Sequence, residues 1–176
     1  MWLGKRTGTR AGGDDAEWAS AYADTLPRVY NFFRFRTGDD ALAQDLTAAT
    51  FERAWRHRQR YRRDLASFTT WLFAIARNVA ASYHRSARYE VGLEAAQNRA
   101  DTLSVEREVE RRDDLARLVT LLARLPPRDR ELVELKYGAA LTNRAIAQIT
   151  GLSESNVGTI LARVIHRLAA RWEDTS

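Results

Sequence analysis

Apolar side chains recur at spacings of three and four along most of the chain, which is the periodicity of amphipathic helices. The pattern predicts helices over 40–58, 68–85, 115–125 and 128–137. Between the second and third of these, the segment 86–113 carries mixed charge and few apolar residues. No segment shows the alternation that is typical of a β-strand. The sequence therefore predicts an all-α chain of two small helical domains joined by a charged linker.

The segment Leu141–Leu168 predicts a helix-turn-helix. Gly151 can adopt the positive φ that ends the first helix, and Ser153 suits the N-cap of the second. The second helix has one apolar side, formed by Val157, Ile160, Leu161, Val164 and Leu168. Its polar side would face outward, a shape that fits a DNA major groove. Helix pairs of this kind also serve as plain packing units, so the motif alone leaves both interpretations open.

The charge composition favours a polyanionic partner. The chain has 28 basic and 23 acidic residues, a net charge of +5 and a pI of about 10.0. All the basic residues except Lys5 and Lys136 are arginine, whose guanidinium makes forked contacts with phosphate and guanine. Because coding bias can also enrich arginine, this count alone decides little.

Other functional classes are disfavoured by what the sequence lacks. It has no cysteine and its three histidines are far apart, so neither a metal nor a cofactor is expected. No apolar run approaches the roughly 20 residues that span a bilayer. The first residues lack the apolar core of a signal peptide, which predicts a cytoplasmic protein without membrane insertion.

Three strings occur in a fixed order: AQDLTAATFERAW at 43–55, FTTWLFAIARNVAASYHR at 68–85 and the C-terminal helix-turn-helix. Together they resemble a bacterial RNA polymerase sigma factor of the extracytoplasmic-function (ECF) group of the sigma-70 family. The resemblance covers about 24–172. It implies sigma domain 2 at 17–88, a linker at 89–112 and sigma domain 4 at 113–174. Before these lies a glycine-rich tail at 1–16, for which we expect disorder.

The resemblance implies a promoter-specificity subunit that is not itself an enzyme. Such a subunit binds core RNA polymerase, recognises the minus-35 element as duplex, and melts and captures the minus-10 element. The implied partners are the clamp helices of the largest polymerase subunit, the flap of the second-largest subunit, promoter DNA and a candidate anti-sigma factor. The residues leave open a stand-alone helix-turn-helix transcription regulator. They disfavour a nucleic-acid enzyme, because no Gly-rich phosphate loop or nucleophile–base pair is visible.

For docking on core polymerase, the resemblance implies Asp45, Leu46, Ala49, Phe51 and Glu52. Exposed positions such as Asp45 suit an interface, whereas for Phe51 and Trp55 a place in the core is the favoured interpretation. Ala48 and Ala49 stand where the family often has a glutamine–glutamate pair, which puts the polar docking contacts in doubt.

For the minus-10 element, the resemblance implies Arg62, Asp64, Ser67, Phe68, Trp71, Arg77, Asn78 and Arg85. Phe68 is the candidate for stacking on bases, the polar side chains suit base edges and the arginines suit phosphates. Burial suits Trp71 better, and Asn78 could serve as an internal cap instead. The neighbouring basic block (Arg56, Arg58, Arg60, Arg62 and Arg63) is either a phosphate-facing strip or a solvated face.

For the minus-35 element, the implied contacts are Arg144, Ser153, Ser155, Asn156, Gly158, Thr159, Arg163 and Arg167. Gly158, Ile160 and Ile165 stand where relatives often carry basic residues. This recognition face is therefore less cationic than usual, and Arg144 and Arg167 are left as candidates for phosphate contacts. We expect a promoter preference that differs from that of relatives with more charge.

Overall fold

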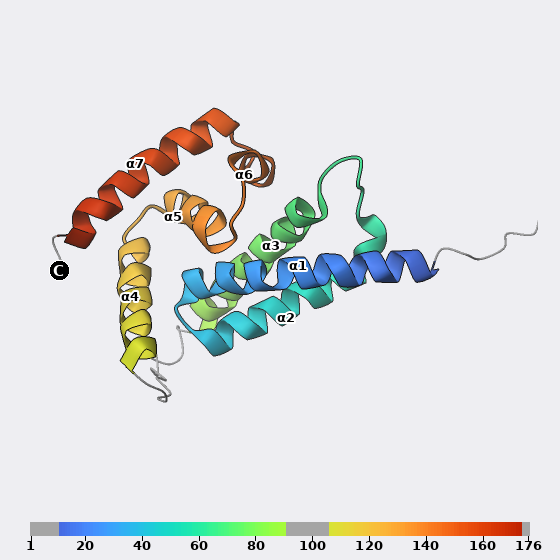
Figure 1. The fold of residues 1–176 in the computed structure, drawn as a ribbon, viewed down its shortest axis with the longest axis horizontal. Coiled ribbons are helices and arrows are strands. Elements are labelled where there is room, and N and C mark those ends of the chain that lie inside the picture. The colour runs from blue at the N-terminus through green and yellow to red at the C-terminus, as the bar shows by residue number, and fades with distance from the viewer. Residues whose placement is uncertain (1–10, 91–105, 174–176) are drawn as a thin grey trace, which may run out of the picture.

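The computed structural model describes residues 11–90 and 106–173, with side chains at 17–86 and 113–173. Within these ranges every regular element is helical (Figure 1). The elements are α1 (Ala11–Thr37), α2 (Asp40–Arg56), η1 (Arg58–Arg60), α3 (Phe68–Glu90), α4 (Glu106–Ala123), α5 (Pro127–Val133), η2 (Glu134–Gly138), α6 (Asn143–Thr150) and α7 (Glu154–Glu173). The prediction of an all-α chain is confirmed.

Helices α1, α2 and α3 form an N-terminal module in which each helix packs against the other two. A tight turn joins α1 to α2: Gly38 has a φ of +70°, and the Asp39 carboxylate accepts a hydrogen bond from the Leu42 N–H at 2.9 Å as the N-cap of α2. The apolar faces meet in a core whose fully buried residues include Val29, Phe32, Phe33, Leu72 and Phe73. Burial of these rings and chains is the main source of stability in the module.

The C-terminal helix-turn-helix has the caps that the sequence predicts. The Thr142 hydroxyl accepts from the Ala145 N–H at 3.1 Å, Gly151 ends α6 with a φ of +77°, and the Ser153 hydroxyl accepts from the Asn156 N–H at 3.2 Å. All five predicted apolar positions of α7 are buried: Val157, Ile160, Leu161, Val164 and Leu168. The predicted motif is confirmed in both helices and in the turn between them.

The segment before the helix-turn-helix is more irregular than its periodicity predicts. The helix expected over 128–137 begins one residue earlier, where Pro127 supplies a preset first-turn φ. Helix α5 ends at Val133, and the π-helical turn η2 follows it. A π turn widens the backbone by one residue, and it carries the Glu134 carboxylate into the interior.

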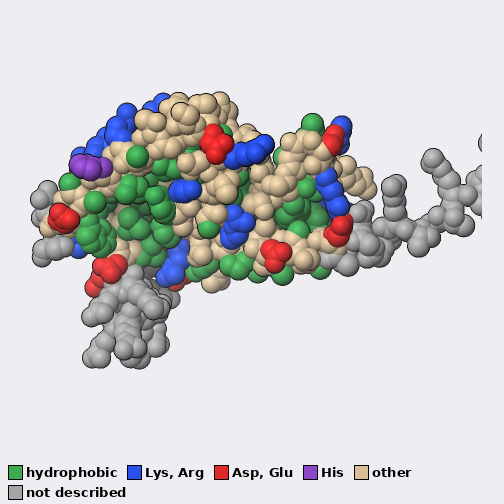
Figure 2. Space-filling view, turned by 45° about the horizontal axis from the view of Figure 1, so that its top comes forward, with side chains coloured by type: hydrophobic (Ala, Val, Ile, Leu, Met, Phe, Trp, Pro, Cys, Tyr) green, Lys and Arg blue, Asp and Glu red, His purple; other side chains and the backbone are tan. Residues whose placement is uncertain are grey.

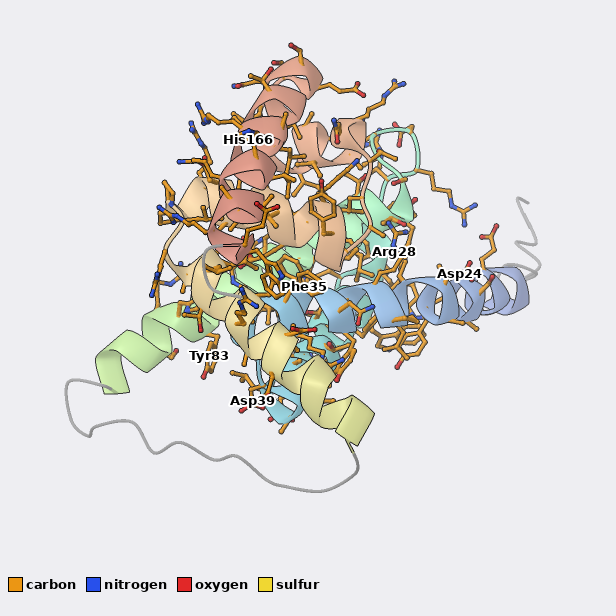
Figure 3. All side chains as sticks on the ribbon, turned by 60° about the vertical axis from the view of Figure 1, so that its left-hand side comes forward. Asp24, Arg28, Phe35, Asp39, Tyr83 and His166 are labelled. Atoms are coloured by element: carbon orange, nitrogen blue, oxygen red, sulfur yellow. The ribbon has the colours of Figure 1, made fainter. Side chains whose placement is uncertain are left out.

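The N-terminal module (α1–α3) and the C-terminal module (α4–α7) contact each other directly. The turn η2 packs on α1, and α6 packs on α3. Arg28 donates from Nε to the Ala139 carbonyl at 2.9 Å and from Nη2 to the Ala140 carbonyl at 3.0 Å. Gly138 lies against Phe35, and a Cβ there would be 3.2 Å from the Phe35 ring. Arg28 and Phe35 both project from α1 toward this contact (Figure 3).

The predicted domain boundaries stay predictions. Helix α1 begins at Ala11, inside the segment 1–16 for which the sequence predicts disorder, and residues 1–10 lie outside the described part of the chain. Helix α3 continues to Glu90 and α4 begins at Glu106, so the linker expected at 89–112 falls mostly on residues 91–105, which are not described.

Candidate nucleic-acid interface

A tight loop leads from η1 into α3 and is held by its own side chains. Arg62 grips Asp64 with two parallel bonds, Nε to Oδ1 at 2.9 Å and Nη2 to Oδ2 at 2.6 Å. This fork lowers the pKa of Asp64 from its ordinary value. The Leu65 N–H also donates to the Arg62 carbonyl at 3.1 Å. The predicted base contact Asp64 therefore has both carboxylate oxygens engaged by Arg62 in this state.

Ser67 closes the loop by capping α3. The Thr70 N–H donates to the Ser67 hydroxyl at 3.1 Å, and the two hydroxyl oxygens lie 2.9 Å apart. This is the hydrogen bonding expected of an N-cap, which satisfies an otherwise unpaired donor in the first turn. The structure therefore gives Ser67 a capping role. Because Ser67 is also exposed, it remains accessible for the predicted contact with a base.

Phe68, at the first position of α3, lies in a cluster of aromatic rings. Its centroid is 5.2 Å from that of Trp18, 5.7 Å from Tyr61 and 5.7 Å from Trp71. Phe68 and Trp71 are both half-buried, and partial burial raises the pKa of Tyr61. Trp18 and Tyr61 are absent from the sequence-derived site, because neither falls in the strings that carry the resemblance. Helical periodicity could not predict that Trp18 contacts Phe68, because it relates residues within one helix and these two are 50 residues apart.

An open hollow of about 1050 Å³ lies beside this cluster. Its walls come from the start of α1, the end of α2, η1 and the start of α3. They include Glu17, Trp18, Asp24, Trp55, Arg58, Tyr61, Arg63 and Phe68. Arg63 pairs with Glu17 across the hollow, and this bond lowers the pKa of Glu17. The walls combine aromatic faces with two arginines, Arg58 and Arg63, and two carboxylates, Glu17 and Asp24. Aromatic faces with arginines beside them are the surface chemistry that binds unpaired nucleic acid.

The remaining predicted minus-10 residues lie further along α3. Asn78 and Arg85 are exposed, and Arg85 donates to the Ser82 hydroxyl at 3.1 Å. Arg77 instead faces the C-terminal module. Its guanidinium makes a two-fold contact with Glu131 at 2.8 and 2.9 Å and donates to the Ile149 carbonyl at 2.6 Å. In this state Arg77 is partly buried, and each of its three guanidinium nitrogens donates to a protein acceptor.

The predicted minus-35 contacts lie at the start of α7 and on its outer side. Ser153, Ser155, Asn156, Thr159 and Arg144 are exposed. Gly158 is half-buried against Asn143, whose Nδ2 would be 3.4 Å from a Cβ at this position. Because base edges are usually read by the first turns of a recognition helix, the hydroxyl and amide groups here are well placed for that contact.

Arg163 and Arg167 lie further along α7 and converge on one buried carboxylate. Asp129 of α5, 3% exposed, has Oδ2 at 3.1 Å from Arg167 Nη2 and 3.8 Å from Arg163 Nη2. Arg128 approaches its other oxygen at 3.5 Å. Nitrogen-tipped side chains project from α7 beside His166 (Figure 3). Asp129 therefore ties α5 to α7 and leaves both arginines partly exposed.

Some of the docking residues expected on α2 are exposed and others are buried. Asp45 and Glu52 are exposed, and Ala49 is half-buried. Leu46 and Phe51 are buried in the core, so they support the helix and do not themselves face outward. Between α1 and α2 runs an apolar groove of about 460 Å³, lined by Tyr22, Leu26, Pro27, Tyr30, Gln44, Thr47, Ala48 and Phe51. Apolar and basic side chains are interleaved on the face seen in Figure 2.

The core interpretation of the two aromatic residues on α2 is right for one and wrong for the other. Phe51 is 6% exposed and packs on Tyr22, with 4.4 Å between ring centroids. Trp55, one turn further along α2, is 42% exposed, and its ring meets Trp18 of α1 edge to face. None of the described helices is long and apolar enough to cross a membrane.

Two family models match the chain. Sigma-70 region 2 matches residues 21–89, and Sigma-70 region 4 matches residues 115–168. The first therefore covers α2, the loop and almost all of α3, together with most of α1. The second covers α5, η2 and α6, the second half of α4 and most of α7.

Sequence relatives and solved structures agree with these matches. The ECF RNA polymerase sigma factor BldN of Streptomyces coelicolor is 32% identical over 87% of this chain, which spans 58% of that relative's length. The ECF RNA polymerase sigma factor SigM of Bacillus subtilis is 31% identical over 82% of this chain and 88% of its own length. The sigma factor RpoE of Bartonella quintana, solved with the anti-sigma factor NepR, shares the fold: its TM-score is 0.68 at 22% identity, over 89% of this chain and 97% of that one. CnrH, solved with the cytosolic domain of CnrY, gives a TM-score of 0.64 at 20% identity, over 92% of this chain and 88% of that one. The chain belongs to the extracytoplasmic-function group of RNA polymerase sigma factors.

Proposed function

We propose that this chain gives core RNA polymerase its selectivity for a set of promoters and has no enzymatic activity of its own. The observation that carries the proposal is the pairing, in one chain, of a capped helix-turn-helix with an arginine-flanked aromatic hollow. The first suits intact duplex and the second suits separated strands. Membership of the sigma-factor family supports the same division of labour.

The C-terminal module reads the minus-35 element as duplex. Helix α7 enters the major groove with its N-terminal end, so that Ser155, Asn156 and Thr159 reach base edges. Arg144, at the start of α6, contacts a backbone phosphate. Arg163 and Arg167, which Asp129 holds in place, lie on later turns of α7, where phosphates are nearer than bases.

The N-terminal module captures the minus-10 element after it opens. Opening is uphill, since each base step forfeits about 1–2 kcal/mol of stacking. Phe68 and the rings around it recover part of this energy by stacking with unpaired bases. Arg62, Asp64, Ser67, Asn78 and Arg85 surround the path of the strand, while Trp71 supports Phe68 from the protein side.

Core polymerase binds along α2, where Asp45 and Glu52 supply exposed charge and Ala49 lets a partner helix approach closely. The apolar groove beside α2 offers anchoring positions for the clamp helices of the largest subunit. The flap of the second-largest subunit is the proposed partner of the C-terminal module. An anti-sigma factor is a further proposed partner, because the sigma factor RpoE of Bartonella quintana, which shares the fold, was solved with the anti-sigma factor NepR bound.

Run-off transcription with purified core polymerase and a promoter library tests the proposal. We expect initiation from a subset of sequences that share two elements, and none from core polymerase alone. A stand-alone regulator would instead bind an operator without polymerase and show no affinity for core enzyme in a pull-down. That pair of results would overturn the proposal in favour of the regulator.

A further inference from the structure

Trp55 is an aromatic side chain that lies outside the buried core. It ends α2 with 42% of its surface exposed, whereas Phe51, one turn earlier, is buried. The Trp55 ring meets Trp18 edge to face with 5.3 Å between centroids, and the rest of the indole faces outward. A single exposed ring is ordinary on a protein surface, so it is the groups around Trp55 that point to a ligand.

Arg58 lies over the Trp55 ring and is held there. Its guanidinium carbon is 4.0 Å from the ring centroid, and its Nη1 donates to the Trp55 carbonyl at 2.9 Å. A guanidinium plane stacked on an indole presents its second face and its other N–H groups to the outside. Nucleic-acid-binding proteins stack unpaired bases on such planes as well as on aromatic rings.

The pair lies at the edge of the aromatic hollow, beside rings already assigned to strand capture. Trp55, Arg58, Tyr61 and Phe68 line the same hollow. Trp18 bridges the two ends, since its centroid is 5.3 Å from Trp55 and 5.2 Å from Phe68. The aromatic surface is therefore continuous from the end of α2 to the start of α3.

Charge decides which partner fits this surface. The exposed arginines nearest to Trp55 in sequence are Arg53, Arg56, Arg58 and Arg60. Glu52 is neutralised by Arg56, with 2.5 Å between Oε1 and Nη2. These four arginines form a strip next to Trp55 in the chain, and Arg58 among them lines the hollow, where Glu17 and Asp24 also lie. Such a strip beside stacked rings suits a flexible polyanion with unpaired bases better than it suits another protein helix.

We propose that Trp55 and Arg58 form a stacking platform for an unpaired base of the opened promoter strand. The platform extends the capture site from α3 across the hollow to the end of α2. This inference rests on the proposed function, because it names further residues and a ligand class, single-stranded DNA, for the same site. The strand would pass from Phe68 to Trp55 with its phosphates against the arginine strip.

The test measures binding of the full-length chain to a fluorescein-labelled 20-nucleotide single strand of mixed sequence and to the same sequence as duplex. Trp55→Ala should weaken single-strand binding roughly tenfold, the contribution of one stacked base, and leave duplex binding within twofold. Trp55→Phe should restore most of the affinity. Arg58→Lys, which keeps the charge and removes the planar group, should weaken single-strand binding more than duplex binding.

Tyr137→Ala is the matched control, since this ring on η2 is 50% exposed and lies outside the hollow. It should leave both affinities unchanged. Circular dichroism and thermal melting report folding, and the Phe and Lys variants decide the matter if the alanine variant is unstable. If the Trp55 and Arg58 variants lose single-strand and duplex binding equally, these residues do not select unpaired bases, and the proposal is overturned.

A second measurement separates this proposal from the function on which it rests. Affinity for core polymerase is measured for the same variants by gel filtration and anisotropy. Unchanged core affinity with weaker single-strand binding supports the platform. Lower core affinity with unchanged single-strand binding assigns Trp55 to the polymerase interface and overturns it. Failure of the whole chain to direct initiation would reject the proposed function, whereas the oligonucleotide result would still stand.

Discussion

Glu134 is an acidic residue that the fold buries completely. Its side chain is fully buried where the two modules meet, 2.7 Å from Arg36 and 3.5 Å from Arg130. Burial raises the pKa of Glu134 to about 7, although both arginines favour the charged form; neighbouring Glu131 adds to the increase. This carboxyl group therefore changes charge close to neutral pH.

The shift makes stability depend on pH in a defined window. The folded chain holds a proton on Glu134 up to about pH 7, and the unfolded chain loses it near 4.5. The folded state thus binds more protons between these values, so this group's contribution to the free energy of unfolding is largest below pH 4.5 and falls as the pH rises to 7. Glu134→Gln removes this dependence, because the amide does not titrate.

Urea unfolding at pH 5, 6, 7 and 8 checks this expectation. The difference between wild type and Glu134→Gln should change by at most about 3 kcal/mol across the window, in favour of the variant at higher pH. If the difference instead stays constant from pH 5 to 8, the buried group is held as a carboxylate by its two arginines, because it is then ionised in the folded and the unfolded chain throughout this window.

Phe68 gives a second prediction for a single residue. Phe68→Leu keeps an apolar side chain among Trp18, Tyr61 and Trp71 but removes the face on which a base can stack. We expect slower promoter opening, measured by permanganate reactivity of unpaired thymines, with unchanged affinity for core polymerase. Equal losses in opening and core binding would assign Phe68 a structural role only.

At the scale of the element, the turn between α6 and α7 depends on one glycine. Gly151 has a φ of +77° and nothing within 4 Å of an added Cβ, so any cost of alanine there comes from the backbone alone. Gly151→Ala should lower the free energy of unfolding by about 1–2 kcal/mol. Gly158→Ala, inside α7 and only in ordinary contact with Asn143, should instead be neutral or stabilising by up to about 1 kcal/mol.

Chemical denaturation of both variants measures these values side by side. Opposite signs for two identical substitutions, seven residues apart, would show that backbone conformation controls the turn. A loss of equal size at both positions would instead point to crowding or to a general intolerance of methyl groups in this motif.

The helix-turn-helix was predictable because its signals are local. Gly151, Ser153 and the apolar spacing of α7 act within a few residues of one another, and each has the role expected from the sequence. The π turn η2 was not predictable, because the apolar spacing of α5 continues through it. Its first residue, Glu134, is buried against Arg36, a contact between residues 98 apart that no local spacing records.

The candidate site was predictable in part, for the same reason. The strings that carry the resemblance contain Phe68 and Trp71, and the structure brings these two rings together. Trp18 joins them only through the fold. The apolar spacing of α2 does not distinguish Trp55, which is exposed, from Phe51, which is buried one turn earlier.

At the scale of the whole molecule, the N-terminal and C-terminal modules are in contact, and we call this arrangement closed. Arg77 of α3 is held by Glu131 of α5 and by the Ile149 carbonyl, so that all three of its guanidinium nitrogens already donate to the C-terminal module. The predicted minus-10 contact at Arg77 therefore needs the modules to separate at α3 and α6. Part of the binding energy of the promoter or the polymerase is consumed in this opening.

Removing the acidic partner should release the arginine. Glu131→Ala should raise the affinity of the free chain for a promoter fragment with a pre-opened minus-10 segment several-fold, corresponding to about 1 kcal/mol. Arg77→Ala should lower it, although both variants lose the same contact between modules. Fluorescence anisotropy of the free chain with this fragment measures both changes.

Asp114→Ala is the charge-matched control, since it removes one negative charge from an exposed position on α4. An equal gain for this control and for Glu131→Ala would reduce the effect to net charge. A gain for Arg77→Ala would mean that Arg77 only holds the modules together and does not contact DNA.

The near absence of lysine gives the contact between modules a chemical reporter. Lys5 and Lys136 carry the only side-chain amines among 176 residues, and Lys136 is half-buried on η2, the turn that packs against α1. Acylating reagents will therefore modify very few positions. The yield at Lys136, normalised to that at Lys5, would follow the opening of the molecule in unmodified, full-length protein, without an engineered dye or a single mutation.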